Sequence, residues 1–195
     1  MVIDTLLGDR ILVSSRNAES KTKSGIILFN TAPIAPYVTG EIVQTGTMLK
    51  DHTHLKAGKF CKFRRGTGEQ YNDGENDYLI MRSTEVYLVG DTENIKICAS
   101  PVCYTVLLAE RLLCLPCKEE NKTQGGIMLL PGADLLKALI VIRGVDIIQN
   151  NYLGVDDNDF VFYRRGSGLP YPEENDKGDM VNYIILNREE ILLAE

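Results

Sequence analysis

The feature that most constrains this chain of 195 residues is an internal duplication. Three motifs of the first half return in the second half in the same order: LLGDRIL at 6–12 as LLAERLL at 107–113, SGIIL at 24–28 as GGIML at 125–129, and FRRGTG at 63–68 as YRRGSG at 163–168. Corresponding positions lie 101, 101 and 100 residues apart, so the spacing inside each copy is nearly preserved. Each copy is long enough to close its own hydrophobic core. We therefore predict two homologous domains in tandem, residues 1–96 and 97–195.

Composition sets the broad class. With 44% hydrophobic and 25% charged residues, the chain has the makeup of a soluble globular protein. No apolar run approaches the roughly 20 residues that span a bilayer, and residues 1–4 lack the basic start of a secretory signal. Five cysteines, an odd number, argue for a reducing compartment. We expect a protein without a membrane partner, located in the cytoplasm of a bacterium or an infected host cell, or in an organelle stroma as a mature protein.

Charge differs between the two copies. Residues 1–100 carry 12 Lys and Arg against 12 Asp and Glu, whereas residues 101–195 carry 9 against 15. The whole net charge of −6 therefore belongs to the second copy. Nonspecific binding of nucleic acid normally uses a basic face, which this balance does not provide. We expect no nucleic-acid partner.

Short segments with alternating apolar residues favour strands throughout the chain. The expected strands are residues 10–14, 40–45, 59–63, 78–82 and 85–89 in the first copy, and 111–115, 138–143, 159–163, 183–187 and 191–194 in the second. No segment has a long helical period. Several short strands with glycine-containing turns, in about a hundred residues, predict an all-β fold with a small antiparallel barrel or sandwich in each copy.

Each copy also contains one long polar segment that carries an aliphatic cluster. In the first copy, residues 17–36 lead from a Ser- and Lys-rich stretch into Gly-Ile-Ile-Leu-Phe at 25–29. In the second copy, residues 118–134 carry Gly-Gly-Ile-Met-Leu-Leu at 125–130. Loops of this length are usually functional or disordered. The alternative is that each aliphatic run is one more core strand, because short apolar runs are ambiguous.

Taken in order, these motifs resemble the GroES-type co-chaperonins. The resemblance rests on Asp-Arg before an aliphatic strand, the loop with Gly-Ile-Ile-Leu, GEIVQTG at 40–46, KAGKF at 56–60 and YLIMRSTEVYL at 78–88. It covers nearly all of residues 6–89, and residues 107–194 match more loosely. The connections at 46–57 and 144–157 are shorter than the roof hairpin of many relatives, which predicts a thin or open top.

The resemblance implies two GroES-like β-barrels whose mobile loops dock aliphatic tripeptides into grooves on a large, GroEL-like, ATP-dependent chaperonin ring. The residues that fall on the tripeptides are Ile26, Ile27 and Leu28 in the first loop and Ile127, Met128 and Leu129 in the second, with Gly25, Gly125 and Gly126 as loop hinges. The tandem form resembles chloroplast double co-chaperonins, and a phage-encoded co-chaperonin is equally compatible. The implied protein is not an enzyme, needs no cofactor, assists protein folding and self-associates into a ring-like homo-oligomer.

Two functions from other classes remain as alternatives. One is a structural protein that uses the barrel for assembly, for example in a virion. The other is a phosphate- or nucleic-acid-binding module, in which the paired motifs at 64–68 and 164–168 offer arginines and bare backbone amides. We favour a tight strand-end turn whose arginines pair with acidic residues of the same or a neighbouring subunit, because acidic residues lie nearby at Glu69, Asp73, Glu173 and Glu174. The Walker lysine and the strand-to-helix context of a phosphate loop are also missing.

Two further groups have spacings that suggest metal or redox chemistry. Cys114 and Cys117 form a CxxC pair, but on the strand expected at 111–115 their side chains would point to opposite faces. No second CxxC or nearby histidine completes a zinc set. His52 and His54 lie in an expected turn without a third ligand. We therefore expect no metal site.

Overall fold

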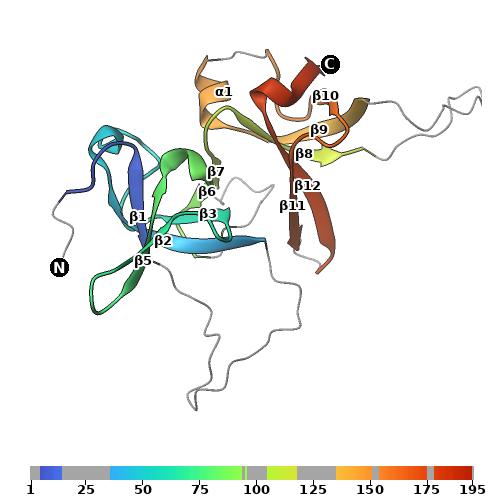
Figure 1. Ribbon diagram of the computed structural model, residues 1–195. Coiled ribbons are helices and arrows are strands. Elements are labelled where there is room, and N and C mark those ends of the chain that lie inside the picture. The colour runs from blue at the N-terminus through green and yellow to red at the C-terminus, as the bar shows by residue number, and fades with distance from the viewer. Residues whose placement is uncertain are drawn as a thin grey trace, which may run out of the picture. The chain divides into compact units, whose positions relative to one another are not determined.

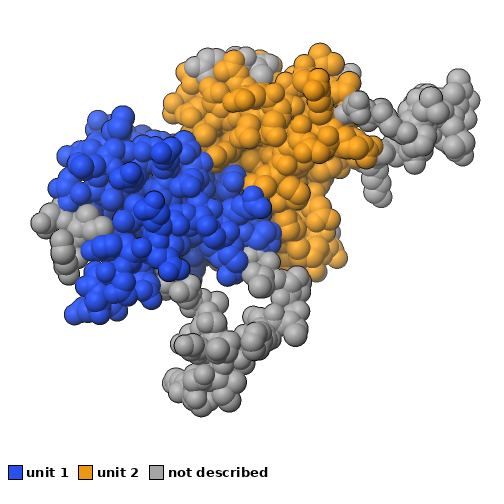
Figure 2. All heavy atoms as spheres, viewed as in Figure 1, with its two compact units in different colours: residues 1–106 blue, residues 107–195 orange. Residues whose placement is uncertain are grey.

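A computed structural model describes residues 5–14, 36–93, 95, 105–117, 135–150, 154–174 and 178–194 (Figure 1). The chain divides into two compact units, residues 1–106 and 107–195 (Figure 2). The boundary predicted between residues 96 and 97 falls in a stretch outside the described residues, and it stays a prediction.

Unit 1 is built on a seven-stranded sheet with the order β4-β5-β1-β2-β3-β6-β7. In chain order, the strands are β1 (Arg10–Ser14), β2 (Tyr37–Thr45), β3 (Phe60–Arg64), β4 (Glu69–Asn72), β5 (Asp77–Arg82), β6 (Val86–Gly90) and β7 (Val106–Leu107). The second residue of β7 is the first of unit 2. Two 3-10 helices, Thr47–Leu49 and Ser83–Glu85, lie in the connections. No strand forms between β2 and β3, so the short connection holds no hairpin.

Unit 2 is built on a six-stranded sheet with the order β11-β12-β8-β9-β10-β13. The strands are β8 (Arg111–Pro116), β9 (Leu135–Arg143), β10 (Phe160–Arg164), β11 (Leu169–Glu174), β12 (Met180–Asn187) and β13 (Ile191–Ala194). A 3-10 helix, Arg188–Glu190, precedes β13, and the α-helix α1 (Val145–Asn150) follows β9. Within the described part of the chain, no helix is long and apolar enough to cross a membrane.

The two units share one topology. The first six strands of unit 1 occur in the same spatial order as the six of unit 2, and their assigned pairings are antiparallel. The predicted all-β fold with two tandem domains is confirmed, and each of the ten expected strands is present. Strands β4, β7 and β11 and the short helix α1 were not predicted.

The core of unit 1 comes from the inward-facing residues of its central strands. Ile11 and Val13 of β1, Ile42 of β2, and Cys61 and Phe63 of β3 are at most 2% exposed. Along β3, the buried Cys61 and Phe63 alternate with half-buried or exposed neighbours, as the two-residue period of a strand requires. Each such aliphatic or aromatic side chain contributes about 1.5–3 kcal/mol when it is fully buried.

The core of unit 2 is made from the corresponding strands. Its buried cluster consists of Leu112, Cys114, Ala138, Ile140, Ile147, Val155, Val161, Tyr163 and Leu186. Ile147 comes from α1, which shows why this helix forms here: it places one apolar side chain on the cluster while its neighbour Ile148 stays 53% exposed. The connection after β9 therefore helps to cover the core of its own unit.

The duplication extends to single hydrogen bonds. The Gly46 amide donates to the Arg10 carbonyl at 2.7 Å, and the Gly144 amide donates to the Arg111 carbonyl at the same distance. These bonds hold the end of the longest strand of each unit against the start of its first strand. The two copies have kept their backbone geometry at this point despite different side chains around it.

The glycines at these two positions are required by a close backbone approach. A Cβ atom on Gly46 would lie 2.3 Å from the Gly8 carbonyl oxygen, and one on Gly144 would lie 2.1 Å from the Ala109 carbonyl oxygen. Backbone cannot move aside as a flexible side chain can. The backbone of Gly46 is otherwise ordinary, with φ of −71° and ψ of 167°, so the constraint is steric and not conformational.

We predict that Gly46→Ala lowers the free energy of unfolding by about 2–4 kcal/mol, because the added methyl group must displace backbone. Gly58→Asn is the matched control. Gly58 has a positive φ of 84° but open space around it, and its counterpart Asn158 adopts φ of 76°. We expect a change below about 1 kcal/mol there. Urea unfolding followed by circular dichroism measures both, and equal effects would contradict the close-approach explanation.

Candidate functional site

The predicted site residues lie outside the described residues. This holds for Ile26, Ile27, Leu28, Ile127, Met128 and Leu129 and for the predicted hinges Gly25, Gly125 and Gly126. Their assignment stays a prediction. The structure does describe the strand ends between which each segment runs, and we call these strand ends the loop bases.

The first loop base joins the end of β1 to the start of β2. These strands pair antiparallel, with Ser14 opposite Glu41. Toward its start, β2 pairs with β3 on its other side, where Tyr37 lies opposite Arg64. The Arg65 amide donates to the Pro36 carbonyl at 2.8 Å. The chain therefore returns from the first loop directly onto the turn after β3.

The second loop base has the same construction. β8 pairs with β9, with Pro116 opposite Ala138, and the Cys117 amide donates to the Lys137 carbonyl at 2.9 Å. At its start, β9 pairs with β10, where Leu135 lies opposite Arg164. Both long segments thus leave and re-enter their sheets between equivalent neighbouring strands.

The repeated Arg-Arg-Gly motif forms the turn at each loop base. Gly66 and Gly68 have φ of 83° and 87°, and Gly166 and Gly168 have φ of 87° and 79°. This left-handed region suits glycine and penalises other residues. The turn follows a strand and leads into β4 or β11, not into a helix. The motifs thus form strand-end turns whose backbone needs the glycines, and the pairing of their arginines with acidic residues stays a prediction.

The two loop bases differ in their packing. Tyr37 is 7% exposed and packs edge-on against Tyr87, with ring centroids 5.7 Å apart and an interplanar angle of 87°. Burial, with a smaller contribution from Tyr87, raises the pKa of Tyr37 well above its usual value, so its phenol stays neutral. At the equivalent place in unit 2, Leu135 is 45% exposed. The first loop base has an aromatic anchor that the second lacks.

Comparisons with known proteins identify the family of this chain. The model of the family described as chaperonin 10 kDa subunit matches residues 5–89. The co-chaperonin GroES of Bacteroides fragilis is 38% identical over 84 residues, which cover 43% of this chain and 92% of that protein. The co-chaperonin GroES of Solidesulfovibrio magneticus is 33% identical over 89 residues, which cover 43% of this chain and 92% of that protein. The chain belongs to the GroES family.

A two-domain relative matches a longer region. The 20 kDa chloroplast chaperonin of Spinacia oleracea is 30% identical over 128 residues, which cover 63% of this chain and 47% of that protein. The match thus spans about half the length of this chloroplast relative. The resemblance to tandem GroES-type co-chaperonins is confirmed, and the GroES relatives indicate a co-chaperonin role. The bacterial and chloroplast relatives are compatible with cytoplasm or stroma.

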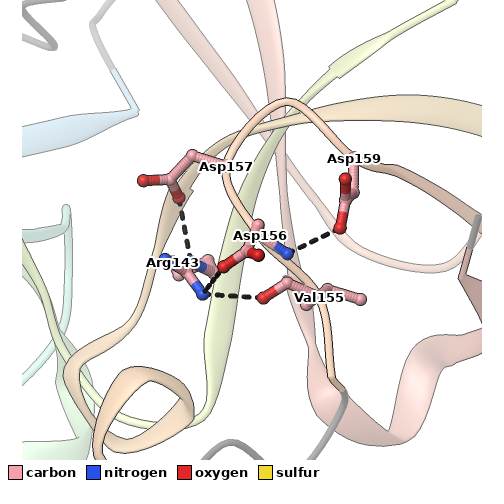
Figure 3. Close-up of polar contacts among 5 residues, drawn as sticks. All are labelled: Arg143, Val155, Asp156, Asp157 and Asp159. Carbon is pink, nitrogen blue, oxygen red and sulfur yellow. Dashed lines mark hydrogen bonds and ion pairs between the residues drawn. The ribbon is translucent and has the colours of Figure 1, made fainter.

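Arg143 organises a polar cluster in unit 2 (Figure 3). From the end of β9, its Nη1 donates to the Val155 carbonyl at 2.7 Å and to Asp156 Oδ1 at 2.8 Å, and its Nε donates to Asp157 Oδ1 at 3.0 Å. The Arg143 side chain is 18% exposed, whereas that of Asp156 is 82% exposed. The guanidinium offsets part of the negative charge of the turn before β10 and fixes the turn to β9.

This cluster has no local sequence signal, since the partners of Arg143 lie 12 to 14 residues away along the chain. In the GroES-like unit 1, the same turn has the opposite charge. Lys59 and Asp159 occupy equivalent positions, and each amide donates to a carbonyl three residues earlier at 3.2 Å. The backbone of the turn is retained while its charge is reversed.

We predict that Arg143→Ala lowers the free energy of unfolding by about 1–2 kcal/mol, because it removes three hydrogen bonds, two of them to exposed carboxylates. Arg188→Ala is the matched control. Its side chain is 41% exposed and lies 3.5 Å from Glu110, so we expect a loss below about 0.5 kcal/mol. Thermal unfolding of both variants checks this, and an equal loss in both would show that the Arg143 cluster adds nothing.

The CxxC pair is split between two environments. Cys114 is fully buried in the core of unit 2, whereas Cys117 is exposed after the end of β8. Burial raises the pKa of the Cys114 thiol to about 12, and it raises that of Cys61 to about 12 as well. Among the described residues there is no group of His, Cys, Asp and Glu that could hold a metal ion. Cys114 is a core residue, not half of a redox pair.

We predict that iodoacetamide at pH 8 leaves Cys61 and Cys114 unmodified in the folded protein. With a pKa of about 12, roughly one thiol in ten thousand is a thiolate at this pH, and the thiolate is the nucleophile. Cys117 serves as the exposed reference, and the urea-unfolded protein as the positive control. Peptide mapping by mass spectrometry reads the result. Labelling of Cys114 at the rate of Cys117 would contradict its place in the core.

The two histidines lie close together in the connection between β2 and β3. Their ring centroids are 6.2 Å apart, and His52 Nδ1 accepts a hydrogen bond from the Leu55 amide at 3.4 Å. This bond helps to close the turn between the 3-10 helix and β3, as expected for loop histidines.

Proposed function

We propose that this protein is a co-chaperonin that caps a large, GroEL-like, ATP-dependent chaperonin ring through both of its long loops. The observation that carries the proposal is the retention of the same loop base in two units whose surfaces have otherwise diverged. Membership of the GroES family supports it. In this proposal the ring binds and hydrolyses ATP, and the chain catalyses no reaction and holds no cofactor.

The proposed contact is made by the aliphatic tripeptides. Burying three aliphatic side chains contributes about 1.5–3 kcal/mol for each one. Ordering a loop opposes this by about 1–2 kcal/mol for every backbone residue that is fixed. A single loop therefore binds weakly. Two loops on one chain, multiplied by self-association into a ring-like homo-oligomer, bind together through their effective concentration.

The proposal predicts a graded loss of binding. Replacing Ile26, Ile27 and Leu28 with Ser should weaken binding to a GroEL-type ring about tenfold or more, and also replacing Ile127, Met128 and Leu129 with Ser should abolish it. Binding in the presence of nucleotide is measured by co-sedimentation and calorimetry. Met48→Ser with Met180→Ser is the matched control, because these described residues are 78% and 61% exposed but lie outside the loops.

Thermal unfolding of the same variants separates the possible outcomes. If the tripeptides are core strands, each large-to-small change costs about 2–5 kcal/mol of stability, and the loop assignment is wrong. If the six-residue variant is folded and still binds the ring, the co-chaperonin proposal is wrong.

A further inference from the structure

One arginine ends the strand at each loop base. Arg64 is the last residue of β3 and Arg164 is the last residue of β10, and both side chains are exposed. Within the described ranges of the chain, neither guanidinium makes an ion pair or a hydrogen bond. The two charges therefore add no visible contact to the units that carry them.

These two charges are retained where neighbouring charges have changed. Just before the arginine, unit 1 has lysines at positions 56, 59 and 62, and unit 2 has Asp156, Asp159 and Phe162 at the equivalent positions. The same half of the chain carries the whole net charge of −6. Arg164 has kept its positive charge in an acidic unit.

Other retained charges have a role in the fold. Glu85 and Glu190 correspond, and each carboxylate accepts a hydrogen bond at 2.7 Å from the amide three residues earlier. These bonds close the 3-10 helix before the last strand of each unit. Arg64 and Arg164 have no such bond among the described residues, so their retention points to a partner outside this part of the chain.

Both arginines lie where a long loop re-enters its sheet. Arg64 is opposite Tyr37, the first residue of β2, and Arg164 is opposite Leu135, the first residue of β9. In unit 1 the next amide of the turn, that of Arg65, is bonded to the returning chain at Pro36. The turn and the returning chain thus form one surface, which a partner bound to the loop approaches.

We propose that Arg64 and Arg164 face an acidic surface on the chaperonin ring, beside the grooves that take the tripeptides. The proposal rests on the proposed function and adds the chemistry of the surface that the loop bases meet. An exposed ion pair contributes only about 0.2–1 kcal/mol to a complex. Charges at the rim of an interface mainly raise the association rate, because they attract the partner before contact. The arginines therefore speed docking, and the tripeptides hold the ring.

Carboxylates are a better partner for these arginines than the phosphates of a nucleic acid. A guanidinium pairs with either group in a bidentate way. A nucleic acid, however, is a long polyanion, and Asp156, Asp157 and Asp159 lie in the turn that leads into the strand of Arg164. Their charge repels a polyanion, whereas local acidic groups on a protein surface can meet the arginine alone.

Removing the two charges tests the proposal. Arg64→Gln with Arg164→Gln should lower the association rate constant with a GroEL-type ring and nucleotide about threefold to tenfold at about 0.1 M salt. At about 0.5 M salt the difference should fall below about twofold, because salt screens the attraction. The dissociation rate constant should change by less than about twofold. Arg64→Lys with Arg164→Lys keeps the charge and should keep the rate. Surface plasmon resonance measures both constants.

Lys50→Gln with Lys56→Gln is the matched control, because it removes the same charge from exposed residues of the connection between β2 and β3. The Gly58 amide of this connection donates to the Ile42 carbonyl at 2.8 Å. Ile42 is about 16 Å along β2 from Tyr37, at about 3.3 Å per residue. This exceeds the screening length of about 10 Å at 0.1 M salt, so the control should bind at the unmodified rate.

Native mass spectrometry and circular dichroism of the glutamine variant accompany the rates. An unchanged oligomer and fold are expected. Loss of the oligomer would assign the arginines to a neighbouring subunit and overturn the proposal. Binding of a single-stranded DNA 20-mer that requires the arginines would assign them to phosphate and overturn it as well.

The rates also separate this proposal from the proposed function. If the unmodified chain binds the ring and the glutamine variant binds at the same rate at about 0.1 M salt, the role of the arginines is wrong and the proposed function stands. Equal slowing by the lysine control would likewise overturn the assignment to the loop bases. If the unmodified chain does not bind the ring, the proposed function fails and the role of the arginines fails with it.

Discussion

One steric constraint fixes the frame of each unit: the residue after its longest strand must pass within contact distance of the turn before its first strand. At Gly46 and Gly144 there is no room for a Cβ atom beside the carbonyls of Gly8 and Ala109. The contact fixes the register of β1 on β2 and of β8 on β9, and it thereby determines which residues face the core. The other end of the same strand pairs carries the loop bases, so the position of each loop depends on this contact.

The sequence predicted most of this frame, because alternating apolar residues and a repeated turn motif have direct structural consequences. It did not predict β4, whose four residues include no buried side chain and so lack an alternating pattern. Helix α1 was missed because six residues are too few to show a helical period. Arg143 gave no local signal, since its partners come from a turn that only the fold brings back to β9. The aliphatic tripeptides lie outside the described residues, so the loops remain predicted from sequence.

The two units share backbone features that the fold requires, while the side chains on their surfaces differ. The turns before β3 and β10 make the same backbone hydrogen bond, although unit 2 has Asp159 at the position of Lys59. Asn158 stands at the position of Gly58 and has nearly the same positive φ. The loop bases are retained in both units, which is why we place the shared co-chaperonin role there. The last strands, in contrast, differ sharply in exposure, since Leu88 of β6 is fully buried and Leu193 of β13 is 61% exposed.

The central claim is that both loops, and not one, engage the chaperonin ring. Hydrogen exchange of the chain alone and with a GroEL-type ring and nucleotide tests it most directly, because amide protection reports local ordering residue by residue. The account predicts that the amides of residues 26–28 and 127–129 exchange rapidly in the free chain and become protected together when the ring is added, while those of Ile42 and Phe63 are protected throughout. Protection of residues 26–28 in the free chain equal to that of Ile42, or no change in either loop on adding the ring, would contradict it.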